Sequence, residues 1–431
     1  MKIGTRPLGA AALAAALSAV LAVLAVGWLD RLPPLPTLQA RAPDDAASVA
    51  RGAVLARAGN CASCHTARGG APYAGGRAIA TPFGSVQAGN LTPHAATGLG
   101  AWSADEFWRA LHHGRGRDGR RLLPAFPYTE FTRITRADSD ALFAFLRTLA
   151  PVAQPRRPHT LRWPYGTQAA LAVWRTLFFR PGVWQDDPRR SPEWNRGAYL
   201  VQGVAHCVAC HGGRNVLGAT DDAGFGGGLL ATGHWYAPSL RHADEAGLAD
   251  WPLDEIVALL RDGVAPRGRV SGPMAEVVLH GTQHLPAADL HAMAVYLRSL
   301  PAATRPRRPA TEPPDPARLA LGASLYRDHC GDCHGAAGEG GVTPDGRPAV
   351  PALAGNRIVT MAPPANLVRA IAHGGFGPAT AGNPRPWSMP PYEQRLSDDQ
   401  IAALASWLRQ SWGASAAALR ADEVARYRGG E

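Results

Sequence analysis

Cys61-Ala62-Ser63-Cys64-His65 is a C-x-x-C-H motif, and the chain repeats it as Cys207-Val208-Ala209-Cys210-His211 and Cys330-Gly331-Asp332-Cys333-His334. The three copies use all six cysteines of the chain. C-x-x-C-H is the attachment signature of c-type haem, in which both thiols form thioethers with the porphyrin and the histidine becomes the proximal iron ligand. A zinc site would need the C-x-x-C units in pairs, and three is an odd number. The sequence therefore predicts three covalently attached haem c groups, with His65, His211 and His334 as iron ligands.

The spacing of the motifs divides the chain into three units. The copies lie 146 and 123 residues apart in a chain of 431 residues, which is long enough for about three domains of 100–150 residues. A hydrophobic fraction of 46% and a charged fraction of 18% are typical of an ordered globular protein. The net charge of +10 is not accompanied by any nucleic-acid-binding motif, so no nucleic-acid partner is expected.

The N-terminus predicts export. Residues 8–29 form an apolar run of 22 residues that follows Lys2 and Arg6, so the positive end is expected to stay in the cytoplasm. The run is long enough to span a bilayer, and only a poor and distant cleavage site, Leu38-Gln39-Ala40, follows it. Residues 1–30 are interpreted as a signal anchor or a cleaved signal peptide, with the anchor favoured. The rest of the chain is expected on the periplasmic side of the cytoplasmic membrane.

A helical pattern recurs on both sides of each motif, which indicates three copies of one domain. A helix with a central glycine precedes each motif, at 51–55, 196–200 and 321–325. An aromatic-Leu-Arg triplet closes each unit, at 145–147, 296–298 and 407–409. We expect the glycine to let the aromatic residue of the last helix approach closely.

Further short stretches carry a resemblance to a known family: 80–84, 90–93, 193–200, 272–274, 351–356 and 389–392. With the three motifs, they resemble class I cytochrome c domains in the order found in the triheme cytochrome c subunit of membrane-bound bacterial dehydrogenases. The resemblance covers about residues 50–413. It implies an electron-transfer subunit, not catalytic alone, that serves a molybdopterin-, flavin- or quinoprotein-dependent dehydrogenase. It also implies a quinone, an oxidase or a soluble cytochrome as the electron acceptor.

The predicted fold is all-α, with three tandem class I cytochrome c domains, long loops and an N-terminal apolar helix. The domains are predicted at 45–150, 191–300 and 317–413, joined by linkers at 151–190 and 301–316, with a tail at 414–431. The first linker holds a helical stretch, 168–179. This stretch either contacts a membrane or partner, or packs across two domains. The second linker is proline-rich and is expected to be stiff.

Methionine is the expected sixth ligand of a haem that carries electrons. The chain has five methionines, and Met274 and Met389 lie 63 and 55 residues after the histidines of the second and third motifs. Both precede the last helix of their unit, and we predict them to be the axial ligands of haems 2 and 3. Met293 falls within a helix and Met361 follows its motif too closely, so both are expected to be core residues.

The first unit differs from the others, because no methionine lies between the first two motifs. Phe126 aligns with the position of Met389. The iron of haem 1 is therefore five-coordinate, bound by a nearby histidine, or bound by a more distant group. The nearest histidines are His112 and His113 as weak candidates, with His94 after them and His159 and His206 as poorer ones.

The loop that accepts a hydrogen bond from the proximal histidine is also predicted. It is the stretch around Pro238 in the second unit and Pro351 in the third. The matching stretch of the first unit, around Gly89, lacks the proline.

Two other functions stay open. An open iron site in the first unit would suit a peroxidase-like haem enzyme, and the anchor would also suit a free-standing membrane-anchored electron carrier. The chain shows no G-x-G-x-x-G motif after a strand, and no β-pattern for a propeller, so the substrate chemistry is assigned to a partner.

Overall fold

The computed structural model describes residues 26–27, 30, 45–220, 224–230, 234–304, 315–344, 346 and 348–429. The predicted apolar helix of residues 8–29, apart from Val26 and Gly27, and most of the linker 301–316 lie outside the described residues. Within the described ranges, no helix has both the length and the apolar character needed to cross a membrane.

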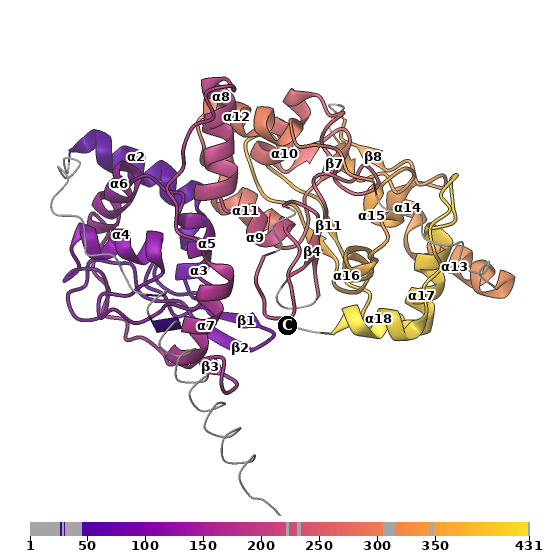
Figure 1. Ribbon diagram of the computed structural model, residues 1–431. Helices are drawn as coiled ribbons and strands as arrows, with labels where there is room; N and C mark the ends of the chain where they lie inside the picture. The colour runs from indigo at the N-terminus through magenta and orange to yellow at the C-terminus, as the bar shows by residue number, and fades with distance from the viewer. Residues whose placement is uncertain are drawn as a thin grey trace, which may run out of the picture.

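The fold consists of three similar helical units that follow one another along the molecule (Figure 1). Each is built on a pair of packed helices: α2 (Ala46–Ala58) with α6 (Arg136–Arg147), α8 (Pro192–Tyr199) with α12 (Ala287–Arg298), and α13 (Pro316–His329) with α17 (Asp398–Leu408). The C-x-x-C-H motifs follow the first helix of each pair as short helical turns, α3 (Cys61–His65), α9 (Val208–His211) and α14 (Gly331–His334). The last helix of each pair is the one that carries the aromatic-Leu-Arg triplet.

A glycine in the first helix lets each pair of helices touch. A Cβ atom on Gly52 or Gly197 would lie 1.9 Å from a backbone carbonyl oxygen of the facing helix, and one on Gly322 would lie 2.3 Å from its counterpart. The three carbonyls belong to Ala141, Ala292 and Ala403, and the Cβ atoms of Phe145, Tyr296 and Trp407 lie within 3.0 Å of the same positions. No side chain fits there. The predicted close approach is confirmed, and it involves the backbone of the facing helix as well as its aromatic residue.

An arginine–aspartate pair also joins the two helices of each unit. Arg51 contacts Asp138, Arg196 contacts Asp289 at 2.8 Å, and Arg318 lies 3.7 Å from Asp399. These aspartates lie in the first turn of the last helix, where a carboxylate also favours the positive end of the helix dipole.

Shorter elements complete each unit. The helices are α4 (Ala104–His113), α5 (Tyr128–Phe131), α10 (Leu253–Asp262), α11 (Pro273–His280), α15 (Arg357–Thr360) and α16 (Ala365–His373), with a π-turn at Leu200–Val204 and a 3-10 turn at Thr282–His284. Small antiparallel sheets lie between them: β1 (Ala78–Thr81), β2 (Gly84–Gln87) and β3 (Thr160–Leu161), then β4 (Gly228–Leu229) with β5 (Tyr236–Ala237), β6 (Val264–Ala265) with β7 (Gly268–Arg269), β8 (Gly341–Val342) with β9 (Pro348–Val350), and β10 (Gly375–Phe376) with β11 (Ser388–Met389). Strands of two to four residues are too short to show a sequence period, and the sequence did not predict them.

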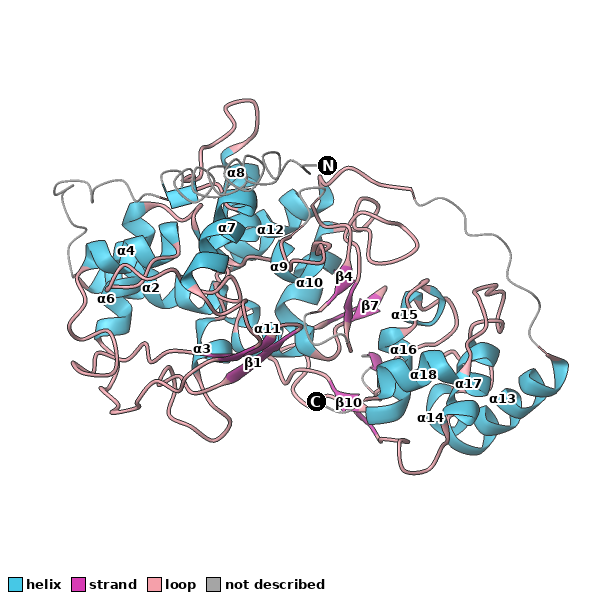
Figure 2. Cartoon of the chain, turned by 60° about the horizontal axis from the view of Figure 1, so that its bottom comes forward, coloured by secondary structure: helices cyan, strands magenta, loops and turns pink. Residues whose placement is uncertain are grey.

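The first two units share one hydrophobic core, and the third has its own. Tyr199 of α8 reaches across the boundary, and its hydroxyl donates to Asp138 of α6 at 2.5 Å. Figure 2 shows the third unit beside this pair as a separate lobe. Asn366 joins this lobe to the second unit, because its amide exchanges hydrogen bonds of 2.9 and 2.7 Å with the backbone of Tyr236.

Both the first linker and the tail are folded. Strand β3 extends the sheet of the first unit, and α7 (Gln168–Phe178) contacts α5, because the rings of Trp174 and Tyr128 lie 6.5 Å apart. In the tail, α18 (Ala421–Arg428) buries Val424 and Tyr427 against α16 and α17.

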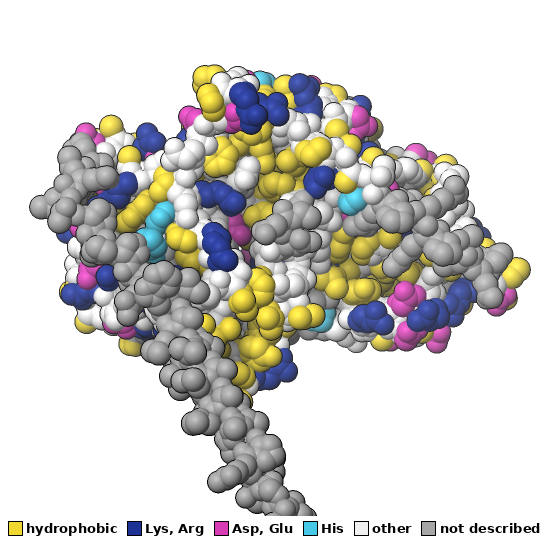
Figure 3. Space-filling model, viewed as in Figure 1, with side chains coloured by type: hydrophobic (Ala, Val, Ile, Leu, Met, Phe, Trp, Pro, Cys, Tyr) yellow, Lys and Arg dark blue, Asp and Glu magenta, His cyan; other side chains and the backbone are white. Residues whose placement is uncertain are grey.

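Apolar side chains gather on the surface over β1–β3, at the lower edge of Figure 3. The helical part of the linker thus packs on the first unit while leaving an apolar surface exposed.

Replacing Tyr199 with phenylalanine removes the hydrogen bond between the first two units. This is expected to lower their free energy of unfolding by about 2 kcal/mol, the typical contribution of a hydrogen bond to a charged group. Denaturant unfolding of the first two units should move to a lower midpoint. Tyr165→Phe, a similar change on the surface, is the control and should leave the midpoint in place. An unchanged midpoint in Tyr199→Phe would show that the hydroxyl does not stabilise the joint.

Candidate functional site

Each C-x-x-C-H motif presents two thiols from one helical turn. All six cysteines are free, and residues three apart lie on the same face of a helix. Burial, with the charge of the second thiol adding to it, raises the pKa of Cys61 and Cys207 to about 12 and that of Cys330 to about 11. No three His, Cys, Asp or Glu side chains of the described residues converge as metal ligands. The two thiols on one face of each turn are placed to form thioethers with one porphyrin.

Each motif histidine is held by a backbone carbonyl. The Nδ1 atoms of His65, His211 and His334 lie 2.7, 2.8 and 3.0 Å from the carbonyl oxygens of Gly89, Pro238 and Pro351. Burial lowers the pKa of all three imidazoles. A neutral ring that donates from Nδ1 keeps the lone pair of Nε2 for a metal. The three predicted carbonyl loops are confirmed, including the loop of the first unit that lacks the proline.

A large cavity lies beside the first motif. Its volume is about 1,660 Å³, above the roughly 300–1,000 Å³ of most ligand pockets. Cys61, Cys64 and His65 line it together with apolar residues such as Phe107 and Phe126, and polar residues line other parts of it. Two thiols and an imidazole facing an apolar chamber of this size fit a covalently bound porphyrin. The site residues of the first unit are thus compatible with haem c.

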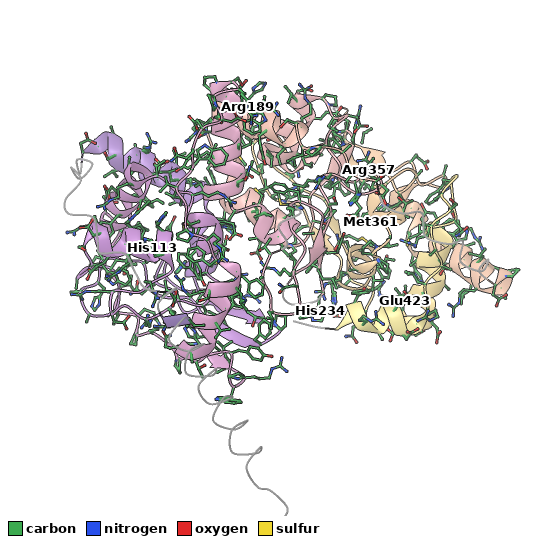
Figure 4. All side chains as sticks on the ribbon, in the orientation of Figure 1. His113, Arg189, His234, Arg357, Met361 and Glu423 are labelled. Atoms are coloured by element: carbon green, nitrogen blue, oxygen red, sulfur yellow. The ribbon has the colours of Figure 1, made fainter. Side chains whose placement is uncertain are left out.

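The four internal methionines differ in burial: two lie inside the hydrophobic cores and two at their edges. Met293 and Met361 are fully buried in the two hydrophobic cores, which confirms them as core residues; Met361 lies among the helices of the third unit (Figure 4). Met274 starts α11, directly after Gly272, and Met389 lies in β11. Both are only partly buried at the edge of a core. Their role as axial ligands stays a prediction.

His112 and His113 do not reach the cavity. Glu106, Phe107, Ala110 and Leu111 are the residues of α4 that line it, and successive helix residues are rotated by about 100°. The Nδ1 atom of His112 lies 2.6 Å from the carbonyl oxygen of Thr132.

The ring of His112 stacks on Trp108 at 4.5 Å, and His113 packs edge-on against it at 4.6 Å. Figure 4 shows His113 on the outer part of the first unit. Burial, followed by the charge of His112, lowers the pKa of His113 to about 4. His112 and His113 are not among the residues that line this cavity, and their role as weak distal candidates stays a prediction.

Besides His65, the histidines that line the cavity are His159 and His206, which sequence reasoning placed last. His159 accepts a hydrogen bond from the backbone of Gln87 at 3.0 Å. His206 lies 3.2 Å from the carbonyl oxygen of Gly59 and packs edge-on to Phe131. Both reach the first unit from outside its sequence range of 45–150. The sequence gives no signal for this, because the contact depends on how the linker and the second unit fold back.

Comparison with known proteins agrees with this geometry. The cytochrome c family model matches residues 49–150 and 319–412. Over 394 residues, the chain is 39% identical to the cytochrome c subunit of a quinone alcohol dehydrogenase from Gluconacetobacter polyoxogenes, covering 88% of this chain and 83% of that protein. The chain belongs to the family of dehydrogenase cytochrome c subunits. The resemblance seen in the sequence is thereby confirmed.

Two further relatives of this cytochrome c chain are named for other dehydrogenases. It is 36% identical to the gluconate 2-dehydrogenase cytochrome c subunit from Pantoea cypripedii, covering 89% of this chain and 90% of that one. It is 39% identical to a nicotinate dehydrogenase subunit from Pseudomonas putida, covering 86% of this chain but 31% of that protein. The relatives thus agree on the cytochrome and differ in the dehydrogenase.

The second unit of this cytochrome c chain lies outside the two stretches that the family model matches. It nevertheless has the same helix pair, the same glycine contact and the same histidine–carbonyl bond as the other two.

The absorption spectrum should distinguish the haem of the first unit from the other two, because it is predicted to lack a methionine ligand. The far-red band of oxidised haem with His and Met ligands is expected to account for two haems per chain, because Phe126 stands where the first unit needs a methionine. Met389→Ala should reduce the band by about half and lower the potential of one haem by on the order of 0.1 V, since axial ligands span about 0.8 V. Met361→Ala, which changes a core methionine, is the control for loss of packing. A band that corresponds to three haems would contradict the prediction.

Proposed function

We propose that the chain is a triheme cytochrome c that carries electrons from a dehydrogenase subunit to the respiratory chain, on the periplasmic side of the cytoplasmic membrane. The observation that carries the proposal is the threefold recurrence of one arrangement: a pair of thiols followed by a histidine whose Nδ1 is fixed by a backbone carbonyl. Haem, when bound, supplies reversible one-electron iron chemistry. The role of the protein is to orient the ligands and set the potentials.

The first two units are arranged for transfer between them. His206 directly precedes the second motif, and its ring lies 3.2 Å from the carbonyl of Gly59, two residues before the first motif. Cys61 and Cys64 of the first motif and Cys210 of the second motif line the same cavity. The two motifs are therefore neighbours in the fold. Since the second unit also contacts the third through Asn366, we place it in the middle of the electron path.

The partner is proposed to be a molybdopterin-, flavin- or quinoprotein-dependent dehydrogenase. The relatives named for alcohol, gluconate and nicotinate dehydrogenases support a dehydrogenase partner. The acceptor is proposed to be a quinone, an oxidase or a soluble cytochrome.

The test is to purify the chain from its own host with the subunits that accompany it. The denatured chain should have the mass of the polypeptide plus three haems. Adding the substrate of the accompanying dehydrogenase should reduce all three haems. A mass that corresponds to fewer haems, or haems that the dehydrogenase does not reduce, would refute the proposal.

A second candidate function is a peroxidase-like reaction in the first unit. Phe126 in the methionine position and the size of the adjoining cavity favour it. Steady turnover of peroxide by the isolated chain, lost in His65→Ala and retained in His334→Ala, would support it. Absence of turnover would leave electron transfer as the function of all three units.

A further inference from the structure

Asp30 is the residue that ties the N-terminal segment to the first unit. Its side chain is 4% exposed, and Arg115, Arg121 and Arg175 contact its carboxylate at 2.7, 2.5 and 2.9 Å. Burial alone would raise the pKa of Asp30, but hydrogen bonds from Arg175 and Arg121 and the charge of these arginines keep it below its ordinary value. The carboxylate is thus the counterion of an arginine cluster inside the fold.

The ion pairs of Asp30 fix the position on the folded first unit at which the apolar run 8–29 ends. Asp30 directly follows the run. Cleavage after Ala40 would remove Asp30 and leave Arg115 and Arg175 buried without their carboxylate, which is strongly unfavourable. The folded first unit therefore favours a chain that keeps the run. A bilayer entered by the run has to lie close to α7, which carries Arg175.

α7, which binds Asp30 through Arg175, also carries part of an exposed apolar face. This face consists of Trp163, Tyr165, Val173, Leu177, Val216 and Leu217, of which Trp163 is 85%, Leu177 56% and Val216 93% exposed. Three contacts join its parts. The rings of Tyr165 and Phe83 lie 4.5 Å apart, the Phe83 ring adjoins Gly218, and the indole of Trp174 donates to the Leu217 carbonyl at 2.9 Å. Figure 3 shows apolar side chains gathered in this region.

The charge around the apolar face suits a lipid surface. Residues 151–185 contain five arginines and no acidic residue. Arg162 and Arg180 are exposed next to the face, and Arg214 lies at the start of the turn that carries Val216. Exposed tryptophan and tyrosine are typical of the interface between membrane and water. Arginines beside them attract anionic headgroups.

We propose that this apolar face lies on the surface of the lipid bilayer, oriented by Asp30, so that the first unit is the one nearest the membrane. The proposal rests on the membrane location given under the proposed function. Trp174, Val216 and Leu217 also line the large cavity of the first unit. The site of the first motif therefore opens toward the side of the protein that faces the bilayer.

The test is lipid photolabelling of the full-length haem-loaded chain. The chain is reconstituted into vesicles of phosphatidylcholine and phosphatidylglycerol that contain a photoactivatable phospholipid, and labelled peptides are mapped by mass spectrometry. Peptides with residues 162–180 and 214–218 should carry about tenfold more label than peptides with Leu321 or Val342, since interfacial side chains reach the acyl-chain boundary. Leu321 and Val342 are exposed apolar residues of the third unit, at 43% and 70%.

Paired variants control for apolar character alone. Leu177→Gln with Val216→Ser should lower labelling of the apolar face several-fold, while Leu321→Gln with Val342→Ser should leave it unchanged. An unchanged haem spectrum verifies that each variant is folded.

Label confined to the run 8–29 would overturn the proposal while leaving the membrane location intact. No label anywhere, the run included, would refute the membrane location itself, independently of electron transfer. Label on the apolar face of the chain alone that disappears when its dehydrogenase subunit is added would overturn the proposal in favour of a protein interface.

Discussion

Replacing His211 with alanine is expected to interrupt electron transfer through the chain while leaving the first and third haems ligated. His211 lies in the middle unit, and a backbone carbonyl 2.8 Å from its Nδ1 leaves Nε2 available as a metal ligand. Axial ligands set haem potentials over a range of about 0.8 V. Loss of the ligand shifts the potential of the middle haem and thereby raises the barrier for transfer through it. An added barrier of about 1.4 kcal/mol slows a step about tenfold, so reduction of the third haem by the dehydrogenase should slow by at least about tenfold.

The measurement is stopped-flow reduction of the purified complex with the substrate of its dehydrogenase. His291→Ala is the matched control, since this histidine lies in the same unit but pairs on the surface with Glu193 at 2.6 Å. Added imidazole should restore part of the rate in His211→Ala by occupying the vacated position. A normal rate in His211→Ala would show that the second unit is not on the path.

Replacing Gly197 with alanine is expected to destabilise the second unit by about 3 kcal/mol. The new Cβ atom would lie 1.9 Å from the carbonyl oxygen of Ala292, so α8 and α12 would have to separate. Overpacking of this kind typically costs about 1–3 kcal/mol, and here the obstacle is rigid backbone. Thermal unfolding, followed by haem absorption, should begin at a clearly lower temperature than in the wild-type protein.

Gly182→Ala provides the control. A Cβ atom at Gly182 would meet nothing within 4 Å, and its backbone angles do not require glycine. This variant should unfold at or slightly above the wild-type temperature, because alanine restricts the unfolded chain. If Gly197→Ala unfolded like Gly182→Ala, the close helix contact would not be a source of stability.

The proximal side of each haem site could be predicted from the sequence because it is local. The motif places the histidine next to its cysteines. The carbonyls of Pro238 and Pro351 follow at a short distance along the chain, and even the loop at Gly89 could be located by analogy with them. The core positions of Met293 and Met361 also followed from helix position and spacing.

The distal side of the first unit could not be predicted in this way. His112 and His113 lie in the right part of the sequence, but they are not among the residues that line the cavity. His159 and His206 line it instead, because the first linker and the second unit fold back onto the first. The role of Asp30 was missed for the same reason, since its arginine partners lie 85 to 145 residues further along the chain.

The cofactor chemistry, the repeat of three units and the glycine at each helix contact follow from residues a few positions apart, so the printed sequence suffices for them. The three C-x-x-C-H motifs themselves are equivalent in the spacing of their cysteines and histidine. How the units join depends on the three-dimensional fold: Tyr199 ties the first to the second, Asp30 fixes the N-terminal segment, and the apolar face forms from the first linker and the second unit. Such features arise from packing between distant segments, which residue spacing does not encode.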